Sequence, residues 1–130
     1  MAPREAAYLD TEVALWLASG ALERLTPKAR ALLETADLLL SPMAFLELEY
    51  LSQIKLIRLN ARDLMRKLKS EVGLRLCDLP FSQVAVAALD ENWTQDPFDR
   101  MIVAQAKANG FSPLVSADGE ISRHYPRTVW

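Results

Sequence analysis

The sequence predicts an α/β domain in which helices cover both faces of a mainly parallel central sheet. Short apolar runs alternate along the chain with longer segments whose apolar residues recur at helical spacing, which is the pattern of strands alternating with helices. A helix between two strands makes a crossover connection, and crossovers join parallel strands. Because 130 residues is close to the commonest length of one domain, we expect residues 1–130 to form a single domain.

Five short apolar runs carry the strand signal. They are short for helices and are bounded by acids, prolines or glycines. The expected strands are residues 6–9, 38–40, 74–79, 113–116 and 128–130. Cys77 lies in the third run, so we expect its thiol to pack in the core, and a lone cysteine excludes an internal disulfide.

The longer segments predict six helices, at residues 13–18, 27–36, 42–54, 61–72, 82–89 and 97–109. Three of them begin with an N-cap residue followed by proline, which suits the first helical position: Thr26-Pro27, Ser41-Pro42 and Asp96-Pro97. A further start resembles a capping box, Asn60 with Asp63. Three helices end before a glycine suited to a C-terminal cap: Gly20, Gly73 and Gly110.

Composition excludes several classes of protein. A hydrophobic content of 51% with 25% charged residues is incompatible with intrinsic disorder, and charges interrupt every apolar segment before it reaches the length of a membrane span. The N-terminus has no signal-peptide pattern, so we expect a cytoplasmic protein. The net charge of −2 provides no global basic field, so any contact with nucleic acid must depend on local patches or metal ions.

Glu47 lies on an apolar stripe of the predicted helix 42–54. The stripe consists of Met43, Leu46, Tyr50, Leu51 and Ile54. A carboxylate in a buried stripe is costly unless it has a partner, whereas Glu49 should face solvent. Either Glu47 binds a cation, or the edge of the stripe is partly wet, or an arginine reaches the carboxylate.

Asp99 repeats this anomaly at the start of the predicted helix 97–109. Ile102, Val103 and Ala106 follow it at helical spacing and place its carboxylate on their face. A structural explanation exists, because Asp96 is a good N-cap and acids in the first turn are favoured by the helix dipole. We interpret Asp96 as a cap, and Asp99 remains open between a capping role and a functional one.

Asp10 and Asp118 follow the first and the fourth predicted strands. In open parallel sheets the ligand site lies beyond the carboxyl ends of the strands. Taken singly, Asp10 could cap the following helix and Asp118 could be a turn residue before Gly119. Together with Glu47 and Asp99, however, they form a set of four acids with no obvious basic partner for all of them.

Four converging carboxylates imply a metal site. They cannot all stay ionised unless cations screen them. Ligation by oxygen alone selects hard divalent ions such as Mg²⁺. Such ions activate water and stabilise an in-line displacement at phosphorus. Metal-assisted hydrolysis of a phosphodiester is therefore the natural hypothesis.

The segments that carry the acids also form motifs. They are Tyr8-Leu9-Asp10-Thr11, Ser41-Pro42-Met43-Ala44-Phe45-Leu46-Glu47-Leu48, Asp96-Pro97-Phe98-Asp99-Arg100 with the helix that follows, and Leu114-Val115-Ser116-Ala117-Asp118. These motifs resemble those of PIN-domain ribonucleases, and specifically the VapC-like toxins of bacterial and archaeal toxin–antitoxin pairs. The resemblance covers nearly the whole chain, and the Asp-Pro-Phe-Asp-Arg segment is its most specific part.

The resemblance implies a PIN-like fold and assigns the acidic site residue by residue. The implied catalytic and metal-binding residues are Asp10, Glu47, Asp99 and Asp118, and the supporting residues are Thr11, Asp96 and Ser116. Thr11 and Ser116 would support the site through hydrogen bonds, and Asp96 would be an auxiliary acid or a helix cap. The implied activity is Mg²⁺- or Mn²⁺-dependent endonucleolytic cleavage of RNA by a homodimer, inhibited by a VapB-like antitoxin.

Basic residues gather in two places. The first group lies on or near one helix and consists of Arg58, Arg62, Arg66, Lys67 and Lys69. It could contact phosphates, but a solvated helix face is the better explanation. The second group, Arg123, His124 and Arg127, follows Asp118 closely enough to lie at the rim of the cleft. We expect His124, the only histidine, to lie at the surface.

Three other classes of function compete with a nuclease. A phosphoacceptor signalling module would need a late lysine, and no lysine follows Asp118; its acceptor candidate Asp78 is followed by Leu79-Pro80. A nucleotide-binding fold would need a glycine-rich phosphate loop, and four glycines do not form one. A PIN-like module that binds RNA or protein without cutting remains open.

Overall fold

The computed structural model describes residues 4–130 and contains one five-stranded sheet. The strands are β1 (Ala6–Leu9), β2 (Asp37–Leu40), β3 (Arg75–Leu76), β4 (Leu114–Val115) and β5 (Thr128–Val129). Their spatial order is β3-β2-β1-β4-β5, and every neighbouring pair is parallel. The predicted α/β class with a parallel sheet is confirmed.

Strand β1 lies at the centre of the sheet and is buried on both faces. It pairs with β2 on one side, where Tyr8 is opposite Leu39, and with β4 on the other, where Tyr8 is opposite Leu114. Ala7, Tyr8 and Leu9 are fully buried, because a parallel sheet covered on both faces needs a continuous apolar run rather than an alternating one.

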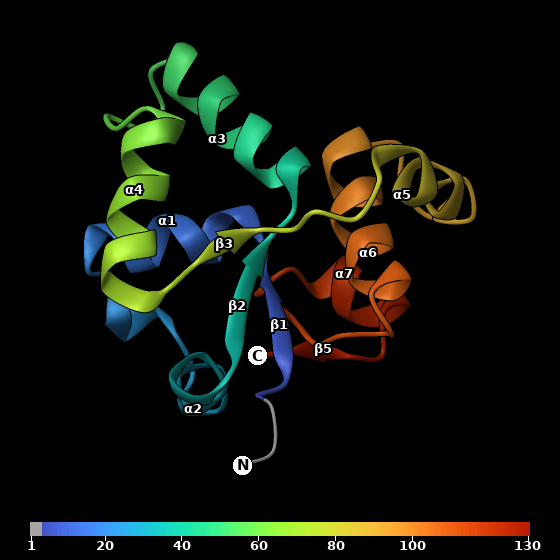
Figure 1. Ribbon diagram of the computed structural model, residues 1–130, viewed down its shortest axis with the longest axis horizontal. Helices are drawn as coiled ribbons and strands as arrows, with labels where there is room; N and C mark the ends of the chain where they lie inside the picture. The colour runs from blue at the N-terminus through green and yellow to red at the C-terminus, as the bar shows by residue number, and fades with distance from the viewer. Residues whose placement is uncertain (1–3) are drawn as a thin grey trace.

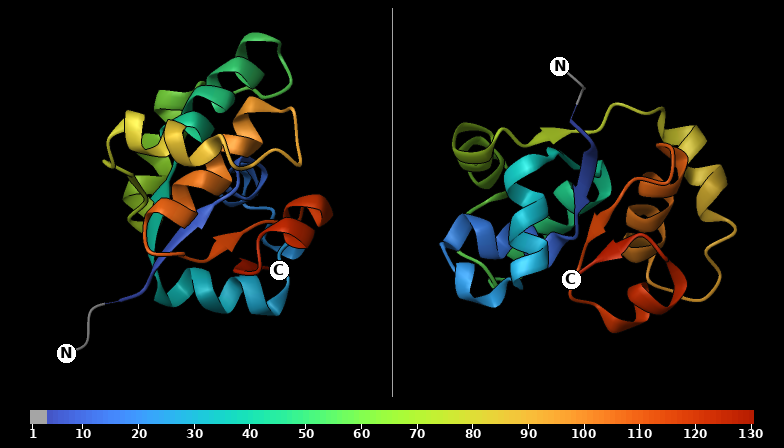
Figure 2. Two further views of the ribbon diagram at one scale, coloured as in Figure 1. Left: turned by 90° about the vertical axis from the view of Figure 1, so that its right-hand side faces the viewer. Right: turned by 90° about the horizontal axis from the view of Figure 1, so that it is seen from below.

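Helices cover both faces of this sheet. They are α1 (Thr11–Ser19), α2 (Pro27–Thr35), α3 (Pro42–Gln53), α4 (Ala61–Val72), α5 (Phe81–Ala88), α6 (Pro97–Ala108) and α7 (Gly119–His124), with a 3₁₀ turn η1 (Leu22–Arg24). Figure 1 shows α1 and α4 on one side of β1 and β2, with α5, α6 and α7 on the other. Figure 2 shows the strands between α2 and the pair α5 and α6. Within residues 4–130, no helix has the length and apolar character needed to cross a membrane.

Local signals placed most helix ends correctly. The hydroxyl of Thr26 accepts a hydrogen bond from the backbone N–H of Ala29, and that of Ser41 accepts one from Met43. At the C-terminal ends, Gly20 and Gly73 have φ values of 73° and 71°, a left-handed conformation that glycine adopts without a steric penalty. The sequence did not predict α7, whose six residues are too few to show a periodic pattern.

The predicted apolar stripe of α3 is wrong. The residues of this helix that are buried are Ala44 and Leu48, whereas Leu46, Tyr50 and Ile54 are 55%, 49% and 46% exposed. Apolar residues surround most of this helix, so periodicity alone could not show which side faces α1, α4 and α6. Glu49 was expected in solvent, but it is half-buried and accepts a hydrogen bond of 3.1 Å from the backbone N–H of Ala61.

The third strand is much shorter than predicted. Of the run 74–79, only Arg75 and Leu76 pair with β2, and both are exposed at this edge of the sheet. Cys77 is buried as expected, and its sulfur lies 3.0 Å from the hydroxyl of Tyr8. An edge strand has a partner on one side only, so few of its residues need to continue the ladder.

Two leucines of α3 test the assignment of its buried side. We expect Leu48→Ala to lower the free energy of unfolding by about 2–5 kcal/mol because it opens a cavity at a fully buried site. Leu46→Ala removes the same atoms from an exposed site and should change that free energy by only about 0.5 kcal/mol. Urea unfolding followed by circular dichroism measures both, and equal losses would contradict the packing described.

Candidate active site

The predicted acids lie around one cleft at the carboxyl edge of the sheet. The cleft has a volume of about 310 Å³. Its lining residues are Asp10, Thr11, Glu12, Leu15, Glu47, Leu51, Asp96, Asp99 and Asp118. The acids reach it from different elements, because Asp10 follows β1, Glu47 lies on α3, Asp99 on α6, and Asp118 precedes α7. The structure therefore gathers residues that are up to 108 positions apart, from Asp10 to Asp118.

Asp10 is buried, and both of its carboxylate oxygens accept hydrogen bonds. Oδ1 accepts one from the backbone N–H of Thr11 at 2.9 Å, and Oδ2 accepts one from the hydroxyl of Ser116 at 2.7 Å. Asp10 is also the N-cap of α1. It therefore caps the helix, as one interpretation of the sequence expected, and also lines the cleft. These bonds fix the orientation of a carboxylate that burial would otherwise make costly.

Within the protein, the partner of Glu47 is a hydroxyl and not the arginine that its sequence position allowed. The hydroxyl of Thr11 donates to Oε1 of Glu47 at 2.5 Å. The bond joins α1 to α3 and holds the half-buried carboxylate toward the cleft. Thr11 thus contacts one acid through its side chain and Asp10 through its backbone N–H.

Asp96 and Asp99 differ in their surroundings although they are three residues apart. Asp96 is exposed and caps α6, and its Oδ1 accepts hydrogen bonds from the backbone N–H groups of Phe98 at 2.8 Å and Asp99 at 3.3 Å. The carboxylate of Asp99 accepts no hydrogen bond from any residue in 4–130. Capping therefore accounts for Asp96 but leaves the carboxylate of Asp99 free toward the cleft.

Asp118 is the N-cap of α7, not a simple turn residue. Its Oδ1 accepts hydrogen bonds from the backbone N–H groups of Glu120 at 2.8 Å and Ile121 at 3.1 Å. Its own N–H donates to the hydroxyl of Ser116 at 3.1 Å. Because the same hydroxyl donates to Asp10, Ser116 links Asp10, which follows β1, to Asp118, which comes after β4.

Burial and mutual repulsion raise the pKa of three acids of the cleft, Asp10, Glu47 and Asp99. Desolvation is the largest cause for Asp99, followed by the charges of Asp96, Asp10, Asp118 and Glu47, and together they raise its pKa to about 7. Desolvation also raises the pKa of Asp10 and of Glu47, although their hydrogen bonds from Ser116, Thr11 and the backbone lower it in part. A cluster of this kind favours uptake of protons or cations.

The donor set of the cleft suits a hard divalent cation. Its polar side chains are carboxylates and one hydroxyl, and none of its lining residues within 4–130 is Lys, Arg or His. In the same part of the chain, no group of three or more His, Cys, Asp or Glu side chains is already arranged to hold a metal ion. Mg²⁺ commonly binds through one or two carboxylates and keeps several waters, so oxygen donors fit this ion without a closed cage.

Of the basic residues expected at the rim of the cleft, Arg127 lies elsewhere, and His124 is exposed and stacked on another ring. Arg127 was expected at the rim of the cleft, but its guanidinium is paired with Glu5 at 2.5 Å, just before β1 and therefore at the opposite end of the sheet. His124 is exposed as expected, and its ring stacks on that of Trp93. In the other basic group, Arg66 pairs with Asp63 at 2.8 Å on the exposed face of α4.

Sequence reasoning missed three residues that line the cleft, Glu12, Leu15 and Leu51. Glu12 occupies the first turn of α1, where an acid is ordinary, so its type and position contained no functional signal. Leu15 and Leu51 carry no distinguishing chemistry. Their contribution to the cleft depends entirely on how α1 and α3 pack.

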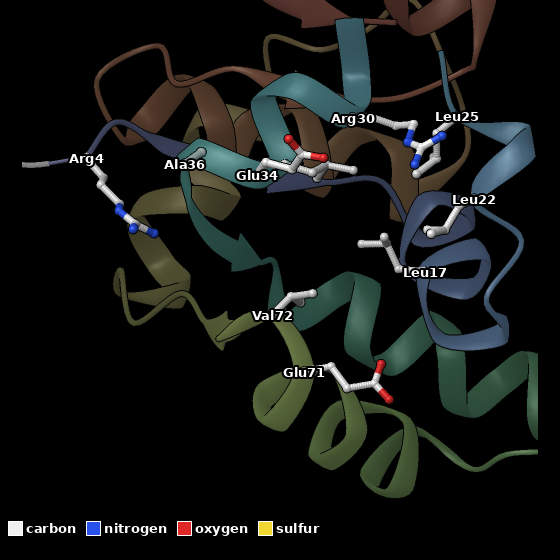
Figure 3. A pocket seen from close by; sticks show the side chains of 10 residues that line it. Arg4, Leu17, Leu22, Leu25, Arg30, Glu34, Ala36, Glu71 and Val72 are labelled. Atoms are coloured by element: carbon white, nitrogen blue, oxygen red, sulfur yellow. The ribbon is translucent and has the colours of Figure 1, made fainter. Parts of the chain in front are cut away.

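A second pocket of about 350 Å³ lies away from the acids. Figure 3 shows side chains from its lining, which include Arg4, Arg30, Glu34, Glu71 and several leucines. Arg4 precedes β1 and Ala36 precedes β2, so this pocket lies near the amino ends of the strands. Its charges are mixed in sign, and it lacks the convergent carboxylates of the cleft.

Comparison with known proteins identifies one family model and several similar structures. The model described as PIN domain matches residues 7–125. No curated protein matches the sequence.

The similar solved structures include three toxin–antitoxin complexes. A toxin–antitoxin complex from Klebsiella pneumoniae has a TM-score of 0.60 and 16% identity, covering 95% of this chain and 96% of that chain. VapBC2 from Rickettsia felis, bound to a DNA fragment from its promoter, has a TM-score of 0.56 and 15% identity, covering 95% of each chain. DNA-bound VapBC from Salmonella typhimurium has a TM-score of 0.53 and 20% identity, covering 85% and 83%. At these identities the similarity establishes a shared fold.

The raised pKa of Asp99 makes a prediction for the metal-free protein. Its value is about 7 in the folded state against an ordinary 3.8, so the folded state binds this proton more tightly than the unfolded state. The resulting stabilisation is fully present below the ordinary value and is lost as the pH rises toward 7. We therefore expect Asp99→Asn to raise the melting temperature in EDTA at about pH 8 and to have a smaller effect at about pH 5.

Thermal unfolding at both pH values measures this effect. Asp90→Asn is the matched control, because Asp90 is an exposed acid outside the cleft. An Asp99→Asn protein no more stable than wild type at the higher pH would show that the carboxylates do not repel one another.

Proposed function

Because the chain belongs to the PIN-domain family, whose model matches residues 7–125, we propose that its acidic cleft is the active site of a metal-dependent endoribonuclease. One observation carries the proposal. Four carboxylates from four different parts of the fold line a single cleft, and none of its lining residues within 4–130 is basic. Stability alone does not explain such a cluster, since desolvation and like charges raise the pKa of Asp10, Glu47 and Asp99.

The proposed metal ligands and catalytic residues are Asp10, Glu47, Asp99 and Asp118, which would hold Mg²⁺ or Mn²⁺. When bound, such an ion supplies charge neutralisation and a more acidic water for attack on phosphorus. The protein's own contribution is placement. Thr11 holds Glu47, and Ser116 holds Asp10 while accepting from the N–H of Asp118.

Asp96 has a supporting role in this proposal. Its carboxylate caps α6 and so sets the start of the helix that carries Asp99. Its exposed charge also contributes to the raised pKa of Asp99. An exposed N-cap acid of this kind acts on the cleft by fixing a helix end rather than by touching the substrate.

The biological role that fits best is that of a VapC-like toxin acting in the cytoplasm. The fold is shared with chains of toxin–antitoxin complexes over most of both lengths. The proposed partners are RNA as substrate, a VapB-like antitoxin as inhibitor, and a second copy of the chain in a homodimer. Exposed apolar residues on α3 and at its C-cap provide surface of the type that protein partners cover: Leu46, Tyr50 and Ile54.

A binding module without nuclease activity is the alternative. It would use the same fold to hold RNA or protein and would need no metal at the acids. The raised pKa of Asp99 favours the nuclease, because a site that only binds RNA would not benefit from a cluster of repelling carboxylates.

The proposal predicts metal-dependent cleavage of RNA that requires Asp99. Purified protein should cut a mixed RNA pool with Mg²⁺ or Mn²⁺ and should be inactive in EDTA. Asp99→Ala should lower the cleavage rate by about a hundredfold or more, because the cleft loses a proposed ligand of the ion that activates water, and even residues that only orient such ligands are typically worth about tenfold to a hundredfold. Mapping the cut ends begins to define the substrate.

Asp90→Asn is the control for this experiment because it removes one acid outside the cleft. Unchanged cleavage by Asp99→Ala would refute the assignment of the site. If the wild type, freed of any copurifying antitoxin, cuts no RNA under any of these conditions, the binding module becomes the better explanation.

Ser116 provides a test of how the acids are positioned. Ser116→Ala removes the hydroxyl that donates a hydrogen bond to Asp10 and accepts one from the backbone N–H of Asp118. We expect activity at low metal concentration to fall by about tenfold to a hundredfold, as for other residues that orient metal ligands. More metal should restore part of the activity. The measurement is the cleavage rate against metal concentration, with Ser122→Ala, an exposed serine of α7, as the control; identical curves would exclude this role for Ser116.

A further inference from the structure

Trp93 and His124 form an aromatic stack between two parts of the chain that lead to the cleft. Their ring centroids are 4.9 Å apart and their planes differ by 7°. Trp93 lies in the segment between α5 and α6 and packs partly against the core. His124 is the last residue of α7 and is exposed. The stack therefore runs from the core through the indole to an imidazole at the surface.

The indole is fixed by a buried carboxylate. Its Nε1 donates to Oε2 of Glu91 at 2.6 Å. Glu91 is only 1% exposed and forms an ion pair with Lys107 of α6. A ring held by a hydrogen bond and by packing keeps one orientation, so a partner that stacks on the pair meets a surface that is already ordered.

Both rings of the stack are close in sequence to acids of the cleft. Trp93 lies three residues before the cap Asp96, and His124 ends the helix that begins after Asp118. A helix of six residues spans only about 9 Å. The exposed Arg123 adjoins the imidazole in sequence and offers a cation for a phosphate.

We propose that the outer face of His124 is a stacking site for an unpaired base of the RNA substrate, a few nucleotides from the bond that is cut. The proposal rests on the ribonuclease function proposed above. Proteins hold single-stranded RNA by stacking bases on aromatic rings, His included, beside cations that contact the backbone. His124 is exposed, and within residues 4–130 no second aromatic ring stacks on it, so the imidazole can accept such a base.

A purely structural role explains less of this arrangement. Favourable interaction with the helix dipole accounts for basic residues in the last turn of α7 but does not require the rings to be parallel. Packing accounts for Trp93 but not for an exposed ring layered on it. A stacking site requires both the parallel planes and the exposed outer face.

Binding of RNA by protein that should not cut it tests the proposal directly. All proteins in the experiment are full length and carry Asp99→Asn to prevent cleavage, and Mg²⁺ is present. The probes are a short fluorescein-labelled single-stranded RNA of mixed sequence and the same ribose-phosphate backbone with abasic positions. Affinity is measured by fluorescence anisotropy for the parent and for added His124→Ala, His124→Phe and Phe111→Ala changes. Phe111 is an exposed aromatic residue just before β4, at the end of the sheet away from the acids.

We expect His124→Ala to weaken binding of the base-containing RNA by about tenfold, in line with the loss of one stacked base. Binding of the abasic probe should not change. His124→Phe should retain the affinity, because phenylalanine keeps a stacking face without a charge, and Phe111→Ala should have no effect.

Three outcomes would overturn the inference, and they separate it from the proposed function. If wild type cuts RNA but His124→Ala leaves affinity unchanged, the stacking site alone is wrong. If His124→Ala weakens both probes equally, the residue acts through charge and not through stacking. If the parent binds neither probe and the wild type cuts nothing, RNA itself is the wrong ligand and the proposed function fails together with the site.

Discussion

The parallel pairing of β1 with β2 and β4 is the constraint on which the acidic cleft depends. Parallel strands bring their carboxyl ends to one edge of the sheet. The residues that follow these three strands are Asp10, Ser41 and Ser116, all polar and all buried. Asp10 and Ser116 bond to one another directly, and Ser41 caps α3, the helix that carries Glu47. The register of three apolar strands thus positions both an acid and the hydroxyls that support the others.

The hydrogen bonds around the cleft divide its acids into held and free groups. Asp10 and Asp118 accept bonds from backbone N–H groups at helix starts, and Glu47 accepts one from Thr11. Bonds of this kind favour the ionised carboxylate. Asp99 has none from the described residues, and its pKa of about 7 reflects burial among like charges. A site in which a partly buried acid such as Asp99 is left free is suited to respond to an incoming cation, since binding removes the repulsion that raises the pKa of that acid.

One side of helix α3 packs in the core, and the other side is exposed and apolar. Ala44 and Leu48 face the core, and Glu47 reaches the cleft from the boundary, whereas Leu46 and Tyr50 remain exposed. Tyr50 also contacts Phe98 of α6, with ring centroids 6.2 Å apart. The exposed apolar side therefore continues toward the helix that carries Asp99. A partner that covered this side would therefore lie close to the acidic cleft.

The sequence by itself determined the α/β class, the starts of most helices and the identity of the acids. Those features are local, because strand runs, N-cap residues before proline and C-terminal glycines act within a few positions of the chain. Only the tertiary structure decided that Ala44 and Leu48, not Leu46 and Tyr50, face the core, that Arg127 pairs with Glu5, and that Thr11 supplies the partner of Glu47. The physical reason is that burial and pairing depend on neighbours that lie far away in the sequence, and periodicity within one helix contains no information about them.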